Sequence, residues 1–99
     1  MLTTINMASE KGGYTLTDRG TWIKYKAQKG AANNMKIVVE NDKVLFNQYS
    51  VITVNKDRCP KVKTELAKSF TNWMVKDETQ KIIGEFKLMD KALFTPNAK

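Results

Sequence analysis

Residues 48–54 place the strongest constraint on the fold, because this short run carries apolar side chains at both alternating sets of positions. In an extended chain, Tyr49 and Val51 lie on one face, while Ile52 and Val54 lie on the other. A strand with two apolar faces is typical of a sheet that is covered by helices on both sides. The run therefore predicts an α/β fold.

Two helices are predicted in the first third of the chain. Residues 2–11 place their apolar side chains on one helical face, and Gly12 with Gly13 forms the expected C-terminal stop. Thr17 is predicted to cap a second helix, which ends near Gly30.

Two further helices are predicted after residue 59. Pro60 occupies the expected first position of the strongest one, which runs towards Met74 with a 3.6-residue apolar repeat, so that Trp73 is expected in the core. Asp77 with Gln80 resembles a capping box at the start of the last helix.

Short extended segments are predicted between the helices and after them. Residues 14–16 are prone to β structure, and residues 35–40 form a compact apolar strand. Residues 41–43 are expected to turn the chain into a further strand at 44–46. Leu93 and Phe94 form a short apolar hook before Pro96.

Two segments carry a resemblance to a known family: residues 14–21, which read Y-T-L-T-D-R-G-T, and residues 45–55, which read L-F-N-Q-Y-S-V-I-T-V-N. They resemble the C-terminal portion of the tungstate-binding proteins that serve ABC transporters, which are type II periplasmic solute-binding proteins. The positions outside these two segments that fit the family pattern are Met1, Thr4, Ile5, Ala8, Glu10, Lys11, Val39, Glu40, Asp42, Phe70 and Trp73.

The resemblance implies a partial periplasmic-binding-protein-like fold of the α/β class. Residues 1–44 would form the C-terminal part of lobe two, residues 45–55 the hinge or crossing strand, and residues 56–99 the C-terminal helical part of lobe one. The hinge residues would be Phe46, Asn47 and Tyr49. The apolar hook at 93–94 would return the end of the chain onto the body. The chain would then be a fragment that lacks the N-terminal portion of its parent, either as a truncated gene or as a piece cut from a longer protein.

The resemblance also implies a function in transport. The full-length family captures tungstate or molybdate, needs no cofactor, and delivers the anion to an ABC permease. A periplasmic or extracytoplasmic location follows, although residues 1–11 carry no signal peptide. Alone, the chain is expected to bind the anion weakly or not at all, and to self-associate, for instance as a domain-swapped homo-oligomer.

Three residues are candidates for contact with the anion. Thr3 and Thr4 correspond to the family pattern at a helix start that points towards the ligand, where hydroxyl and main-chain N–H groups suit an oxyanion. Their alternative role is to cap that helix. Arg19 could hold two oxygen atoms of the anion, and its alternative role is a structural ion pair or an outward-facing position.

Charge and composition leave a second class of function open. The net charge is +7, which would also suit a small basic nucleic-acid-binding domain. The basic residues are scattered, however, and no aromatic residues alternate with them as a base-stacking surface requires, so no nucleic acid partner is expected. A structural remnant without activity is the third alternative.

Enzymatic and metal-dependent functions are not expected. The chain has one cysteine and no histidine, so common zinc-ligand spacings and a Cys/His catalytic pair are excluded. The carboxylate pairs Glu40 with Asp42 and Asp77 with Glu78 are explained by a turn and a helix start. No catalytic or metal-ligating residue is therefore predicted.

Overall fold

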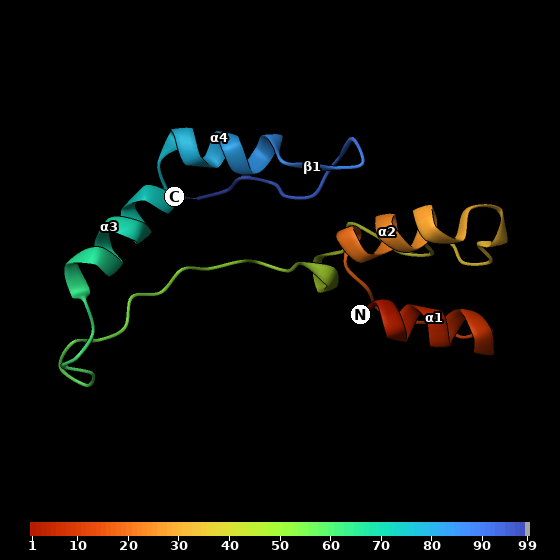
Figure 1. Ribbon diagram of the computed structural model, residues 1–99, viewed down its shortest axis with the longest axis horizontal. Coiled ribbons are helices and arrows are strands. Elements are labelled where there is room, and N and C mark those ends of the chain that lie inside the picture. The colour runs from red at the N-terminus through yellow and green to blue at the C-terminus, as the bar shows by residue number, and fades with distance from the viewer. Residues whose placement is uncertain (99) are drawn as a thin grey trace. The chain divides into compact units, whose positions relative to one another are not determined.

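The computed structural model describes residues 1–98, which divide into two compact units (Figure 1). The first unit contains Met1–Leu45 and Lys87–Leu93. The second contains Phe46–Phe86 and residues 94–98. The chain therefore passes between the units at three points, after Leu45, after Phe86 and after Leu93.

Two packed helices form the first unit, α1 (Leu2–Lys11) and α2 (Arg19–Lys29). Their contact buries Ile5 from α1 and Tyr25 from α2, the two fully buried apolar side chains of the described chain. The Tyr25 ring also stacks on Trp22, one turn earlier, with ring centroids 6.0 Å apart. The small core of this unit is thus a local helix pair.

The ends of α1 and α2 follow from capping residues. Gly12 has φ 64°, and the Gly13 amide donates to the Ala8 carbonyl at 2.8 Å, which confirms the predicted stop of the first helix. The predicted cap of α2 was wrong by one position. Asp18, not Thr17, is the N-cap, because its carboxylate accepts the Thr21 amide.

The predicted strands of the first unit do not form among the described residues. Residues 14–16 and 35–40 have no regular structure, and the predicted strand at 44–46 is largely replaced by the 3₁₀ turn η2 (Lys43–Leu45). A strand needs a neighbour to pair its main-chain groups, and no segment of residues 1–98 pairs with these runs. Their apolar composition is that of strands, but among residues 1–98 they make no main-chain hydrogen bonds to a neighbouring strand.

The remaining elements of this unit are short. A 3₁₀ turn, η1 (Gly30–Ala32), follows α2. The strands β1 (Lys87–Leu88) and β2 (Lys91–Ala92) form an antiparallel hairpin in which Lys87 faces Ala92. Its two-residue turn places Met89 and Asp90 at φ 49° and 62°, as hairpin turns of this length require.

The second unit contains α3 (Thr64–Met74) and α4 (Asp77–Glu85), which pack against each other. The expected helix start at Pro60 was wrong. Residues 55–62 form successive turns instead, in which the Asn55 carbonyl accepts the Cys59 amide and the Asn55 side chain accepts the Asp57 amide. Pro60 lies within these turns, four residues before α3 begins.

The capping box at the start of α4 was also wrong. Lys76 is the N-cap and makes no side-chain capping bond. The Gln80 side chain instead donates to the Met74 carbonyl at 2.8 Å and accepts the Ala98 amide at 3.2 Å. Gln80 therefore joins the end of α3 and the C-terminal segment to α4.

The C-terminal segment packs along the second unit, in agreement with the predicted return of the chain end. The Phe94 ring lies against Phe86 and edge-on to Tyr49, with centroid separations of 6.1 and 5.9 Å. Pro96 lies directly over Gly84 of α4. Among the described residues, these contacts leave Trp73 half exposed, so its predicted core position was wrong.

Residues 48–54 are extended but belong to no strand (Figure 1). The expectation that helices cover both faces was wrong for the described chain, since Ile52 remains 84% exposed. Within residues 1–98, none of the helices is long and apolar enough to cross a bilayer.

Candidate functional site

Thr3 and Thr4 lie in the first turn of α1 and are exposed. Their alternative role as caps is not observed, because Met1 is the N-cap and makes no side-chain capping bond. The first turn of a helix has main-chain N–H groups without intrahelical acceptors, and the first turn of α1 contains no acidic residue. This helix end therefore offers amide and hydroxyl donors with a favourable dipole for an anion.

Arg19 is the first residue of α2 and pairs with Glu40 rather than with either threonine. Its Nη2 atom lies 3.7 Å from the Glu40 Oε2 atom, and both side chains are about half exposed. An exposed pair at this distance stabilises the fold little and can open for a ligand. The geometry thus fits the structural ion pair that the sequence left as an alternative.

The N-terminal end of α2 already holds a carboxylate. Asp18 Oδ1 accepts the Thr21 amide at 2.6 Å, and Oδ2 accepts the Thr21 hydroxyl at 3.0 Å. The main-chain hydrogen bond from Thr21 is the largest cause that lowers the pKa of Asp18, while burial opposes it. The N-terminal end of α1 is therefore open to an anion. At α2, the Asp18 carboxylate already neutralises the N-terminal end of the helix.

The N-terminal ends of α1 and α2 lie at the same end of the first unit (Figure 1). The three predicted residues Thr3, Thr4 and Arg19 thus come from neighbouring helix starts.

The predicted hinge residues lie where the chain first passes between the units. Phe46 and Asn47 are exposed and follow directly after that passage. Tyr49 is exposed except for its edge-on contact with Phe94.

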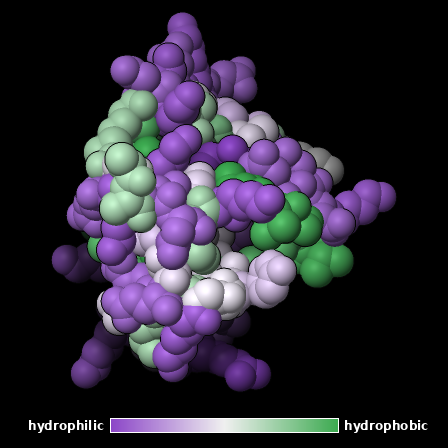
Figure 2. Space-filling view, turned by 90° about the vertical axis from the view of Figure 1, so that its right-hand side faces the viewer, coloured by the Kyte–Doolittle hydropathy of each residue, from purple (hydrophilic) through white to green (hydrophobic). Residues whose placement is uncertain are grey.

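The other polar features of the first unit are less suited to an anion. A hollow of about 220 Å³ lies between residues 12–15 and 35–38, and its lining includes one charged side chain, that of Lys36. Hydrophilic residues dominate the face in Figure 2, with smaller hydrophobic patches among them. Within residues 1–98, no three His, Cys, Asp or Glu side chains gather as metal ligands would.

The sequence did not lead us to predict that Asp18 caps α2 or that Glu40 pairs with Arg19. The signal for Asp18 was present, since aspartate is a better N-cap than threonine and Thr21 lies three residues later. The pairing of Arg19 with Glu40 joins residues 21 positions apart through a loop without regular structure. No local pattern predicts such a contact.

Comparison with known proteins gives consistent results. The profile of a family described as a PBP superfamily domain matches residues 1–78. The chain is 46% identical over 99 residues to the tungstate-binding protein TupA of Campylobacter jejuni, and 43% identical over 96 residues to that of Peptoclostridium acidaminophilum. A Haloferax volcanii protein, named provisionally as an ABC transporter anion-binding protein, is 30% identical over 102 residues.

A solved structure also matches. The tungstate-binding protein TupA from Desulfovibrio alaskensis G20 is 65% identical and superimposes with a TM-score of 0.88, covering 100% of this chain and 40% of that one. The chain spans 37% of the C. jejuni relative and 32% of the P. acidaminophilum relative. All of these relatives are named as binding proteins and none as an enzyme.

Proposed function

We propose a function from one premise: the chain belongs to the PBP superfamily. It would act as part of a two-lobed solute-binding protein that captures tungstate, or a related oxyanion such as molybdate, for uptake by an ABC transporter. Residues 1–44 would supply the end of lobe two, residues 45–55 the hinge, and residues 56–99 the closing helices of lobe one.

One observation carries this proposal: the whole chain matches the D. alaskensis tungstate-binding protein at 65% identity with a TM-score of 0.88. The match covers only 40% of that protein, so the rest of a complete binding site would come from polypeptide outside the match. The chain by itself is therefore not expected to hold the anion tightly.

The part of the site in this chain would be the N-terminal end of α1. Thr3 and Thr4 would donate hydroxyl and main-chain hydrogen bonds to the anion, supported by the uncapped helix end. Arg19 would contribute positive charge from the neighbouring helix start once its exposed pair with Glu40 opens.

Closure of the complete protein around the dianion would present both lobes to a membrane permease. Phe46, Asn47 and Tyr49 would absorb the change in main-chain direction at the passage between the units. An extracytoplasmic location follows from this role.

A hybrid protein tests the proposal. This chain replaces the matched 40% of the D. alaskensis protein, and tungstate binding is measured by calorimetry for the hybrid, the unmodified D. alaskensis protein and the isolated 99-residue chain. We expect the hybrid to bind tungstate and the isolated chain to show no submicromolar affinity. Circular dichroism confirms that each protein is folded.

Substitutions in the hybrid test the site. Thr3→Val with Thr4→Val removes two hydroxyl donors and is expected to weaken binding by roughly tenfold or more. Ser69→Ala, which removes an exposed hydroxyl from α3, is the matched control and should leave the affinity unchanged. A folded hybrid without tungstate binding, or an isolated chain that binds at submicromolar concentration, would contradict the proposal.

A further inference from the structure

The second unit carries a basic turn, residues 56–63, that has no role in the proposed anion site. The turn contains four of the 17 basic residues of the chain, Lys56, Arg58, Lys61 and Lys63. Asp57 is the one carboxylate among them, and all five residues are exposed. The turn therefore holds a net positive charge at the surface of its unit.

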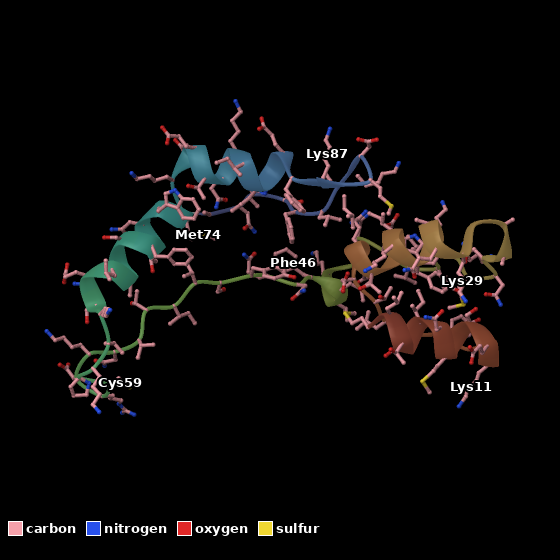
Figure 3. All side chains as sticks on the ribbon, viewed as in Figure 1. Lys11, Lys29, Phe46, Cys59, Met74 and Lys87 are labelled. Carbon is pink, nitrogen blue, oxygen red and sulfur yellow. The ribbon has the colours of Figure 1, made fainter. Side chains whose placement is uncertain are left out.

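Hydrogen bonds fix the shape of the basic turn. The Asn55 carbonyl accepts the Cys59 amide at 3.0 Å, and the Cys59 carbonyl accepts the Val62 amide at 3.1 Å. The Asn55 side chain accepts the Asp57 amide at 2.8 Å. Figure 3 shows nitrogen-tipped side chains around the labelled Cys59, at the far end of the extended segment that begins near the labelled Phe46. The cations are thus presented together by a main chain that is already ordered.

The positive charge of the basic turn is not neutralised within residues 1–98. The ion pairs of the described chain involve Arg19, Lys68 and Lys81. Glu65, the acidic residue in the first turn of α3, already lies 3.8 Å from Lys68. None of the four cations of the basic turn therefore pairs with a carboxylate among the described residues.

The basic turn is expected to stay at the surface of the complete binding protein. Removing a charged side chain from water is costly unless it meets an opposite charge. Polypeptide outside this chain would have to bring several carboxylates to cover the four cations. Apolar side chains differ in this respect, because burial stabilises them without any matching partner. The basic turn is thus an outer surface that a partner other than the same protein can reach.

The composition of the basic turn suits an anionic membrane surface. Phosphate head groups form a plane of negative charge that attracts several cations without a matched pocket. Three of the four cations are lysines, which act as flexible point charges, whereas arginine is the residue that holds a carboxylate in a fixed geometry. Residues 55–61 contain no aromatic or large aliphatic side chain that would insert among lipid tails, so binding would be electrostatic and reversible.

We propose that the basic turn binds the anionic phospholipid head groups of the membrane that holds the permease, and so keeps the binding protein close to it. The choice of a membrane rests on the proposed function, because uptake by an ABC transporter takes place there. The charge of the turn and its exposure do not depend on that function.

Vesicle binding by the hybrid with the D. alaskensis polypeptide tests this surface. Cosedimentation at low salt compares vesicles that contain phosphatidylglycerol with vesicles of phosphatidylcholine alone. We expect the hybrid to bind the anionic vesicles, and to leave them as added salt screens the charges. Each basic residue near such a surface contributes a factor of about five to the partition coefficient.

Paired substitutions locate the binding surface. Lys61→Gln with Lys63→Gln should lower the partition coefficient on anionic vesicles by at least about tenfold. Lys68→Gln with Lys81→Gln is the matched control, because it removes the same charge from the same unit, but each of these lysines already pairs with a glutamate. The control should change the partition coefficient by less than about threefold.

Lys56→Gln with Arg58→Gln is the second test variant, and it should give a similar loss. Circular dichroism confirms that each variant is folded. Every variant should keep the tungstate affinity of the hybrid, because the basic turn lies outside the proposed anion site.

Four results would overturn the assignment. Equal losses in the test variants and the control would show that net charge alone binds the vesicles, and equal binding to phosphatidylcholine would show that the charge has no part. Stronger release by inorganic phosphate than by chloride at equal ionic strength would show a discrete phosphate site. Binding of polyglutamate through the basic turn, without binding to anionic vesicles, would show an acidic protein partner.

The same measurements separate this assignment from the proposed function. A hybrid that binds anionic vesicles through the basic turn but binds no tungstate would refute the proposed ligand and keep the membrane surface. A hybrid that binds tungstate but not anionic vesicles would overturn the membrane surface and keep the proposed ligand.

Discussion

Gly84 shows how a single side chain limits the packing of the C-terminal segment. A Cβ atom at this position would lie 2.7 Å from the Pro96 Cγ atom and 3.2 Å from its Cδ atom. The proline ring is stiff, so the segment would have to move. We expect Gly84→Ala to lower the free energy of unfolding by about 1 kcal/mol. This is the destabilisation from overpacking minus the stabilisation that alanine gives a helix. Urea denaturation measures this change.

Gly20 provides the matched control, because it is also a helical glycine. A Cβ atom there would meet the Asp18 Oδ1 atom at 3.4 Å and the Leu93 Cδ1 atom at 3.7 Å, which are ordinary contacts. Gly20→Ala should therefore stabilise the chain by up to about 1 kcal/mol. In a Pro96→Ala background, Gly84→Ala should also become stabilising. Equal effects of the two glycine substitutions in the unmodified chain would show that Pro96 does not restrict α4.

The start of α2 depends on the ionised Asp18 carboxylate. Its pKa is lowered mainly by the hydrogen bond from the Thr21 amide. A lowered folded-state pKa means that the stabilisation is fully present above the unfolded pKa, near 3.8, and is lost as the pH falls through the folded pKa. Asp18→Asn keeps a capping oxygen but does not titrate.

The free energy of unfolding should consequently fall less steeply below pH ~3.8 in Asp18→Asn than in the unmodified chain. Asp18→Ala should lower it at neutral pH by about 1 kcal/mol, the usual loss for an N-cap. Denaturation curves at several pH values, followed by circular dichroism, measure both effects. The same acid dependence in the unmodified chain and Asp18→Asn would mean that other carboxylates control it.

The helices could be predicted from the sequence better than the strands could, because helical hydrogen bonds are local. The stop at Gly12 and the apolar repeat of α3 each depend on neighbouring residues alone. Residues 35–40 and 48–54 have the composition of strands, but a strand also needs a partner, which the described chain does not supply. The predicted helix start at Pro60 was wrong for another reason, because the turns that Asn55 forms compete with a helix start.

For the same reason, the helix positions of the candidate site residues could be predicted, while their contact with an anion stays a prediction. Thr3 and Thr4 were placed correctly at a helix start, because that position follows from the local pattern. The Arg19–Glu40 pair joins distant residues through an irregular loop. Local spacing carries no information on such a contact.

Each of the two units leaves large apolar side chains exposed. Val44 of the first unit is 90% exposed. Phe46 and Ile52 of the second unit are 71% and 84% exposed.

Such a surface favours self-association when the completing polypeptide is absent. We expect static light scattering of the isolated chain to give a mass that rises with concentration above 11.3 kDa. Added salt should promote this association, because it screens the net charge of +7. The hybrid protein should remain monomeric under the same conditions, since its added polypeptide covers the apolar faces.

The double substitution Leu66→Gln with Phe70→Ser tests whether the exposed apolar side chains of α3 cause the self-association. Both side chains are more than half exposed, so their replacement should leave α3 folded while it reduces the association. Lys68→Gln is the control, because Lys68 is on the same helix and is also exposed. It removes a charge but no apolar surface, so it lowers the repulsion between copies and should not reduce association. A constant mass of 11.3 kDa up to millimolar concentration and high salt would show that the exposed apolar faces do not drive assembly.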